Sequence, residues 1–410
     1  MKIISDLHIH SRFSRATSKF LDIKNLEKYA KIKGINLLGT SDFTHPEWIK
    51  ELKHELTEDE TGILKTKNNF PFILQTEVSL IYTDREKGRR VHNVILAPNL
   101  EIVDQITEYF LSKGRIDYDG RPIFKIPCDE LVESMRKISK DIEVIPAHIW
   151  TPWFSLFGSN SGFNSVKDCF KDQAKHIHAL ETGLSSDPAM NWRLSQLDKY
   201  ALVSSSDLHS FWPWRIGREA TIFDLKKLTY KNIIKALRTK KGLQGTIEVD
   251  PNYGKYHFDG HRNCNVCMNP KETIKVKNIC PKCKKNLTIG VLHRVEELAD
   301  RKEGFIPKDA KPFQTLMPLS EIISTLIGSP IASKKTWKIY DNLINKFKNE
   351  LNIMLEVKKE ELIKVIDKKI ADAIIKNRKG NIIVQPGFDG EYGKPKFSNK
   401  NKIKIKKRDK

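Results

Sequence analysis

Two histidines near the start of the chain, His8 and His10, follow directly on a short apolar run over residues 3–7. Such a run is typical of a buried strand, in which residues two apart point the same way. Both imidazoles can therefore reach one point at the end of that strand. Because neutral imidazole is a common ligand of zinc, manganese and iron, the pair could begin a metal site. Taken alone, it fits two ordinary polar residues equally well.

Further metal-capable side chains lie near the ends of later apolar runs, or within one of them. The expected strands cover residues 35–41, 70–75, 89–97, 143–147, 178–182 and 200–206. The metal-capable residues near them are Asp42 with His45, Glu77, His92, His148, and Asp207 with His209. Helices are expected between the strands, over residues 23–33, 46–56, 100–113, 128–139 and 230–239.

Alternating strands and helices over residues 1–249 predict the α/β class, as a parallel β/α barrel or a related fold. In such barrels the chemistry lies where the strands end. Random placement would not concentrate histidines and carboxylates at so many strand ends. We therefore predict that these residues form one multinuclear metal site, in preference to a set of unrelated polar caps.

Several histidines with one bridging carboxylate can hold two or three divalent ions, such as Zn²⁺, Mn²⁺ or Mg²⁺. Such clusters bind phosphate, generate hydroxide near neutral pH and stabilise a leaving oxygen. Glu77 and Asp207 are the expected anionic ligands, and to these two and His10 we assign catalysis. The sequence holds no glycine-rich phosphate loop, no Gly-x-Ser-x-Gly motif and no dinucleotide fingerprint. Metal-dependent hydrolysis of a phosphoester is the simplest interpretation.

An aromatic loop follows His148, and two arginines follow His209. The rings are Trp150, Trp153, Phe154, Phe157 and Phe163, and the arginines are Arg215 and Arg218. Rings on a loop at this rim could stack on bases or wedge them apart, and the arginines could contact phosphate. The alternative fits the sequence equally well: the rings form a small core under the loop, and the arginines are solvated.

Four of the six cysteines form two Cys-x-x-Cys pairs, Cys264 with Cys267 and Cys280 with Cys283. Two such pairs at this spacing are typical of a zinc ribbon, in which four thiolates close a tetrahedral site. We expect one structural Zn²⁺ here that supports folding and not catalysis. The remaining thiols, Cys128 and Cys169, favour a reducing, cytoplasmic setting over a disulfide framework.

The formal charge of the chain is +21, which favours a polyanionic partner, most simply nucleic acid. No long apolar run could cross a membrane, and the chain enters a strand after one lysine, so we expect neither a membrane span nor a signal peptide. The expected parts are the barrel over 1–249, a zinc-ribbon module over 250–304, a helical C-terminal domain over 305–393, and a basic disordered tail over 394–410. Two or three helices are expected between residues 333 and 378.

Successive motifs of the sequence resemble those of the PHP (polymerase and histidinol phosphatase) superfamily. The matching segments are Asp6-Leu-His-Ile-His10, Thr40-Ser-Asp-Phe43, Glu77, His92, His148 and Ser206-Asp-Leu-His209. The resemblance implies a distorted β/α barrel with up to three metals, the first held by His8, His10, Glu77 and Asp207. Glu77 would bridge to a second metal at His92 and His148, and His209 would serve a third. Phe43 stands where the family often has a histidine, so we expect His45 to take that place.

The whole assembly resembles one branch of that superfamily, the endonuclease Q family of DNA-repair nucleases. The segments that carry this resemblance are Ser11-Arg-Phe-Ser-Arg-Ala-Thr-Ser18, Trp150-Thr-Pro-Trp-Phe154, Gly290-Val-Leu-His-Arg-Val-Glu-Glu-Leu-Ala-Asp300 and the glycine-rich turn 387–393. The resemblance implies cleavage of DNA on the 5′ side of a deaminated base (uracil, hypoxanthine or xanthine) or an abasic site. Residues 397–410 lack the clamp-binding peptide that some relatives carry, so we expect no sliding-clamp partner.

Two other functions compete with this one. A small-molecule phosphatase would share the barrel ligands but would gain nothing from a zinc ribbon and a strongly basic chain. A DNA-binding protein with a degenerate, purely structural barrel should have lost some of the expected ligands, but seven of them are present: His8, His10, Glu77, His92, His148, Asp207 and His209. The metal content of the protein distinguishes a degenerate barrel from an active one, because with a degenerate barrel the chain would bind only the zinc of the ribbon.

Overall fold

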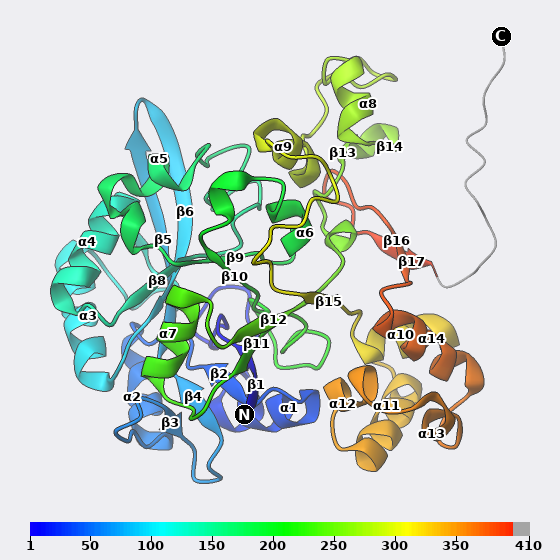
Figure 1. Cartoon of the computed structure of the whole chain (residues 1–410), viewed down its shortest axis with the longest axis horizontal. Helices are drawn as coiled ribbons and strands as arrows, with labels where there is room; N and C mark the ends of the chain where they lie inside the picture. Colours follow the sequence, from blue (N-terminus) through cyan, green and yellow to red (C-terminus); the bar gives the residue numbers. More distant parts are fainter. Residues whose placement is uncertain (397–410) are drawn as a thin grey trace.

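A seven-stranded sheet with strand β1 (Lys2–Asp6) at its centre organises the computed structural model, which describes residues 1–396 (Figure 1). The order of the strands is β15-β12-β11-β1-β2-β4-β3. β1 runs parallel to β2 (Leu37–Gly39), which runs parallel to β4 (Pro71–Ile73), while β1 and β11 are antiparallel. The remaining strands are β3 (Leu64–Lys65), β11 (Ala220–Asp224), β12 (Leu243–Glu248) and β15 (Phe313–Thr315).

Two further sheets complete the N-terminal unit. The four-stranded sheet has the order β7-β5-β6-β8, and the two-stranded sheet pairs β9 with β10 in parallel. Their bounds are β5 (Gln75–Asp84), β6 (Lys87–Leu96), β7 (Ile123–Phe124), β8 (Glu143–Pro146), β9 (Ala179–Glu181) and β10 (Ala201–Val203). The α/β class is confirmed. The strand pairing is mixed, however, because β5 and β6 form a long antiparallel hairpin, and Glu77 therefore lies inside a strand and not beyond its end.

Helices pack on the outer side of these sheets and agree closely with the expected ranges. They are α1 (Ile23–Lys33), α2 (Pro46–Glu55), α3 (Leu100–Lys113), α4 (Cys128–Ile138) and α7 (Tyr230–Thr239). Asp22, Asn99 and Thr229 each precede a helix and accept a hydrogen bond from a first-turn amide, which fixes where the helix begins. Shorter helical segments are α5 (Val166–Phe170), α6 (Pro188–Asn191), η1 (Lys171–His176) and η2 (Ser195–Leu197).

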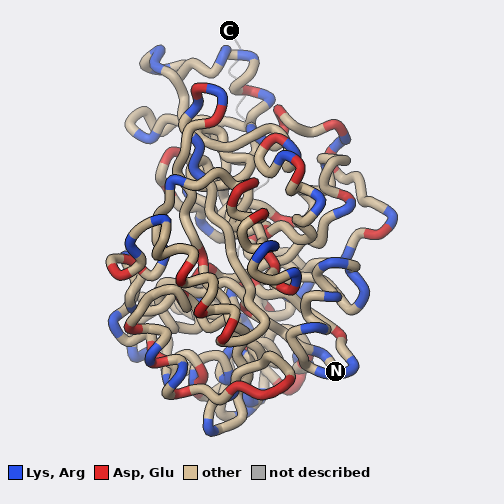
Figure 2. The backbone as a smooth tube through the Cα atoms, turned by 90° about the vertical axis from the view of Figure 1, so that its left-hand side faces the viewer, with Lys and Arg blue, Asp and Glu red and all other residues tan. Residues whose placement is uncertain are grey.

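A small module that follows the N-terminal unit carries the cysteine pairs. It contains η3 (Pro251–Tyr253), β13 (Asp259–His261), η4 (Arg262–Cys264), β14 (Val266–Met268), α8 (Pro270–Lys275) and α9 (Val291–Leu298). Residues 262–285 are strongly basic, with seven Lys or Arg and one acid, Glu272. Figure 2 shows blue segments at the top of the view, the height at which Figure 1 places α8.

A helical unit follows the edge strand β15. It contains α10 (Leu319–Ile327), α11 (Lys334–Phe347), α12 (Glu350–Leu355), α13 (Lys359–Ile363) and α14 (Lys368–Arg378). Four helices, not two or three, lie between residues 333 and 378. A hairpin of β16 (Ile383–Gln385) and β17 (Lys394–Lys396) follows, so residues 394–396 are a strand and not part of a disordered tail. The rest of the expected tail, and the segment without a clamp-binding peptide, lie outside the described residues.

A buried ion pair joins the helical unit to the N-terminal unit. The Lys33 ammonium at the end of α1 lies 2.7 Å from the Glu350 carboxylate at the start of α12 and donates to the Pro213 carbonyl. Glu350 also accepts from the Tyr340 hydroxyl and the Leu319 amide. Both charges are thus compensated inside the protein. No helix within residues 1–396 is both long and apolar enough to cross a membrane.

Candidate metal centre

The first ligand cluster forms where β1 ends. His8 and His10 leave the strand toward Asp207, and a parallel bridge between Ile9 and Leu208 holds the two segments side by side. The Nε2 atom of His10 lies 3.0 Å from Asp207 Oδ1, and Nε2 of His8 lies 3.9 Å from the same oxygen. These three side chains therefore direct one ligand atom each at a common point, with the ligand atoms within 4.8 Å of one another.

The second cluster contains Glu77, His92 and His148, all buried. Glu77 comes from β5 and His92 from the neighbouring strand β6, while His148 follows the end of β8. Glu77 Oε1 lies 2.8 Å from His92 Nδ1 and 3.2 Å from His148 Nε2. Glu77 and His92 are thus brought together by the pairing of β5 with β6, which places both side chains on one face of the hairpin, and not by the ends of parallel strands.

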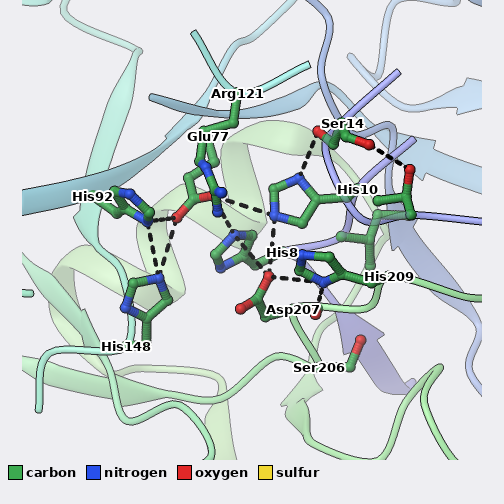
Figure 3. A network of polar contacts seen from close by, with 12 residues as sticks. His8, His10, Ser14, Glu77, His92, Arg121, His148, Ser206, Asp207 and His209 are labelled. Carbon is green, nitrogen blue, oxygen red and sulfur yellow. Dashed lines mark hydrogen bonds and ion pairs between the residues drawn. The ribbon is translucent and has the colours of Figure 1, made fainter. Parts of the chain in front are cut away.

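Glu77 connects the two clusters (Figure 3). Its Oε1 faces His92 and His148, whereas its Oε2 lies 3.2 Å from His10 Nε2 and 3.5 Å from His8 Nε2. Burial alone would raise the pKa of Glu77, but the combined effect of His92, Arg121 and His8 holds that pKa well below its ordinary value. The carboxylate is therefore ionised and can bridge two cations.

The donor atoms fit divalent ions. Within the described part of the chain, the Nε2 atoms of His8 and His10 and Oδ1 of Asp207 are buried without a hydrogen-bond partner. Buried polar atoms are almost always satisfied, so unpartnered atoms that face one another indicate a ligand. Imidazole and carboxylate together suit Zn²⁺, Mn²⁺ and Fe²⁺.

Two carboxylates behind the clusters orient the histidines. Glu181, at the end of β9, lies 2.9 Å from His8 Nδ1 and accepts from the backbone amide of His148 at 2.8 Å. Asp42 lies 3.2 Å from His10 Nδ1 and also accepts from the hydroxyls of Ser11 and Ser14. A carboxylate at Nδ1 keeps the proton there and leaves Nε2 free to bind a metal.

Arg121 is a further charged group of the site, which no sequence motif indicated. Its Nη1 lies 3.1 Å from Glu77 Oε2, although the residue belongs to a loop between α3 and β7. Gly120 lets this loop approach the site, because a Cβ there would come within 2.3 Å of Asp42 Oδ2 and 2.4 Å of Ser14 Oγ. Glu181, which sequence reasoning also missed, could have been found, because an acidic residue in an expected buried strand (178–182) indicates a role in a site.

The structure does not bring two of the expected ligands into either cluster. The His45 ring stacks on Phe13 at a centroid distance of 4.3 Å and precedes α2. His209 lies at the margin, with its ring 5.0 Å from that of His10 and its Nδ1 atom 3.0 Å from the Asp207 carbonyl. A role of either residue in metal binding stays a prediction, and the geometry supports two metal positions more directly than three.

The cysteine module also differs from the expected ligand set. Ligand atoms of His261, Cys264, Cys280 and Cys283 lie within 4.8 Å of one another. Cys267, which the spacing predicts as a ligand, is exposed and is not a member of this group. Sequence spacing identified three of the four grouped side chains and missed the histidine, because His261 lies outside the Cys-x-x-Cys pattern.

The aromatic loop after His148 divides between core and surface. Trp150, Phe157 and Phe163 are buried in the main hydrophobic core, so the packing interpretation holds for them. Trp153 is 41% exposed and contacts Tyr256 edge to face, while the Phe154 ring lies 4.8 Å from the His92 ring. Only these two rings of the loop remain candidates for contact with a substrate.

A cavity of about 530 Å³ opens directly beside the metal centre. His148 and Asp207 line it, together with residues of the cysteine module, the helical unit and the turn 387–393. The wall residues include Trp153, Arg215, Arg218, Tyr256, Glu321 and Tyr392. The volume is of the size that holds one small molecule or one nucleotide. Arg215 and Arg218, the two arginines that could contact phosphate, both line this cavity.

Two solved structures match nearly the whole chain. The lesion-specific endonuclease PfuEndoQ from Pyrococcus furiosus is 32% identical, with a TM-score of 0.88 and 98% of each chain covered. A structure of endonuclease Q in complex with a 27-mer duplex substrate, which has an abasic lesion at the active site, is also 32% identical, with a TM-score of 0.86 and coverage of 98% of this chain and 99% of that one.

Sequence comparisons add two partial matches. The family model for the MJ0043 C-terminal domain matches residues 318–381, which contain all five helices of the helical unit. The uncharacterized protein MJ0043 of Methanocaldococcus jannaschii is 35% identical over 253 residues. That alignment covers 60% of this chain but only 31% of the relative, so the chain spans less than a third of that protein.

Proposed function

The chain belongs to the endonuclease Q family, and from this we propose that it is a DNA-repair endonuclease that hydrolyses the phosphodiester backbone at a damaged nucleotide. The observation that supports this most strongly is the Glu77 carboxylate, which faces one ligand cluster with each of its oxygens. We further propose that cleavage depends on divalent ions and falls on the 5′ side of deaminated bases (uracil, hypoxanthine, xanthine) or abasic sites.

The ligands would hold two ions in the proposed mechanism. His8, His10 and Asp207 would hold one, His92 and His148 the other, and Glu77 would bridge them. When bound, such ions supply Lewis-acid chemistry that activates water and neutralises charge on a phosphate.

The protein's own groups then fix the geometry around that chemistry. Glu181 and Asp42 hold the His8 and His10 rings with their Nε2 atoms directed inward. Arg121 adds a permanent positive charge next to Glu77, where it can stabilise negative charge that develops on the phosphate in the transition state. Burial excludes bulk water and strengthens each of these interactions.

The cavity beside Asp207 would receive the damaged nucleotide. A base inside a duplex cannot be inspected, so it must be swung out of the stack, and weakly paired or missing bases make this cheaper. Trp153 and Tyr256 offer rings on which an extruded base can stack, while Arg215 and Arg218 lie where the flanking phosphates would pass. The basic module 262–285 would add sequence-independent contacts to the DNA backbone.

A nicking assay tests the proposal. End-labelled duplexes that carry one deoxyuridine, one deoxyinosine or one abasic site are incubated with Zn²⁺, Mn²⁺ or Mg²⁺, beside an undamaged duplex of the same sequence. We expect one metal-dependent cut immediately 5′ of each lesion and none in the undamaged duplex. Asp207→Asn should abolish the cut, whereas Asp104→Asn, a matched change in an exposed ion pair remote from the site, should not.

The other outcomes would select a competing function. Hydrolysis of a small phosphomonoester with no cut in any duplex would indicate a phosphatase. Binding of DNA without any hydrolysis, together with a metal content of one ion per chain, would indicate a barrel that has only a structural role.

A further inference from the structure

We propose that the structural zinc ion is bound by His261, Cys264, Cys280 and Cys283, and that Cys267 lies outside the coordination sphere. The His261 Nδ1 atom lies 3.1 Å from Cys283 Sγ, and all four ligand atoms are within 4.8 Å of one another. In a tetrahedral site with zinc–ligand bonds of about 2.0–2.3 Å, neighbouring ligand atoms lie about 3.5 Å apart. The group is therefore compact enough to close around one ion without rearrangement.

The pairing of β13 with β14 explains why Cys267 is excluded. His261 lies opposite Val266, and Gly260 lies opposite Cys267. Directly opposed residues on paired strands point to the same face, and the next residue along points to the other. His261 thus shares its face with Val266, which packs with Cys280 and Leu287 in the small core of the module. Cys267 points away from that face and is exposed.

The coordination chemistry agrees with this geometry. Three thiolates and one imidazole make a standard closed zinc site, so no fifth donor is needed. A Cys-x-x-Cys pair binds one ion when both thiols turn inward, and here η4 and β14 prevent this for the first pair. The second pair, Cys280 and Cys283, flanks a tight turn and contributes both of its thiols.

The choice of His261 connects the zinc to the cavity beside the metal centre. The amide of Arg262, the next residue, donates to Asp389, and Asp389 also accepts from the Thr288 hydroxyl at 2.7 Å. Asp389 belongs to the turn 387–393, whose Tyr392 lines the cavity. An ion at His261 therefore fixes the strand on which this turn is anchored. The significance of this link for the cavity rests on the proposed function. The assignment of the four zinc ligands does not.

Native alkylation of the unmodified full chain tests the assignment first. The zinc-loaded protein is treated with iodoacetamide, and the modified cysteines are identified by mass spectrometry. We expect modification at Cys267 alone, because the other three module thiols are bound to zinc and Cys128 and Cys169 are buried. Protection of Cys267 together with the other three would overturn the proposal.

Substitution with cobalt as a probe gives a second, independent readout. Thiolate-to-Co²⁺ charge-transfer absorption reports only on this module, since the barrel ligands contain no sulfur. We expect Cys267→Ser to keep the full band and one zinc per module, and His261→Asn to lose tight zinc binding. Loss of about a quarter of the band in Cys267→Ser, with zinc retained in His261→Asn, would show that the four cysteines are the ligands. Neither readout requires nuclease activity, so failure of the assignment is distinguishable from failure of the proposed function.

Discussion

The Glu181 carboxylate lies 2.9 Å from Nδ1 of His8, on the side of the ring away from Glu77. The same carboxylate accepts from the backbone amide of His148, a residue of the other ligand cluster. One buried acid thus fixes a ligand of each proposed metal. It is supplied by β9, a strand that pairs with neither β1 nor β8 in a ladder.

Removal of this carboxylate should weaken metal binding without unfolding the protein. For Glu181→Ala we expect about a 10–100-fold loss of barrel metal affinity, the usual effect of losing a hydrogen-bond partner of a ligating histidine. Isothermal titration of the metal-free protein measures this. Glu130→Gln, which alters an exposed ion pair with Lys113, is the control and should bind metal as the parent does. Unchanged affinity in Glu181→Ala would contradict the orienting role.

Loss of the Arg121 guanidinium should slow cleavage strongly and change the metal content of the barrel much less. We expect Arg121→Met to slow cleavage by about 10²-fold, because it removes a preorganised positive charge at the proposed phosphate position. Arg121→Lys should recover part of this loss, since it restores charge but not the planar guanidinium. Single-turnover kinetics, with metal content measured in parallel, separates the two effects. Arg115→Lys, in the same loop but exposed, should leave the rate unchanged.

Removal of one partner of the buried Lys33–Glu350 pair should destabilise the protein more than removal of both charges. Glu350→Gln leaves the Lys33 ammonium uncompensated, which we expect to cost about 3–5 kcal/mol of unfolding free energy. The double variant Lys33→Met with Glu350→Gln should be more stable than Glu350→Gln alone. Chemical denaturation of the four proteins of this cycle measures the coupling. A double variant that loses the sum of the two single losses would show that the pair is not coupled.

Two buried glutamates should make stability fall toward alkaline pH. The Ser204 hydroxyl lies 3.0 Å from Glu219 and 2.9 Å from Glu248, and neither carboxyl is solvent-exposed. Burial raises the pKa of Glu219 to about 8 and that of Glu248 well above its ordinary value. The folded protein retains protons that the unfolded chain releases near pH 4.5, so stability should decline from there through about pH 8, where Glu219 releases its proton.

Glu248→Gln provides the check on this pair. A neutral amide at this position removes one of the two ionisations, so the decline between pH 5 and pH 8 should become shallower. We expect the variant to gain on the order of 1 kcal/mol over the parent at pH 8. Unfolding free energies across this pH range measure the effect, and Glu60→Gln, a change at an exposed carboxyl, is the control. Parallel curves for Glu248→Gln and the parent would contradict a raised pKa of Glu248 in the folded protein.

Local signals in the sequence were enough for much of the scaffold and part of the site. Three helices begin where they were expected, at residues 23, 100 and 230, and in the structure each start is capped by the residue before it, a contact that involves the first turn alone. His8 and His10 could be paired because strand geometry relates residues two apart. Four helices in place of two or three between residues 333 and 378 show the limit of apolar periodicity, which does not mark short breaks within a helical tract.

What the sequence by itself determined is which residue types can bind a metal and which strand carries the first two of them. Only the tertiary structure decided that Glu77 faces both clusters, that Arg121 reaches it from a loop, and that His261 replaces Cys267 beside the other cysteines. The physical reason is that spacing along the chain constrains direction only within one element. Contacts between elements depend on strand register, on loops that approach where a glycine allows it, and on which face of a strand the core covers.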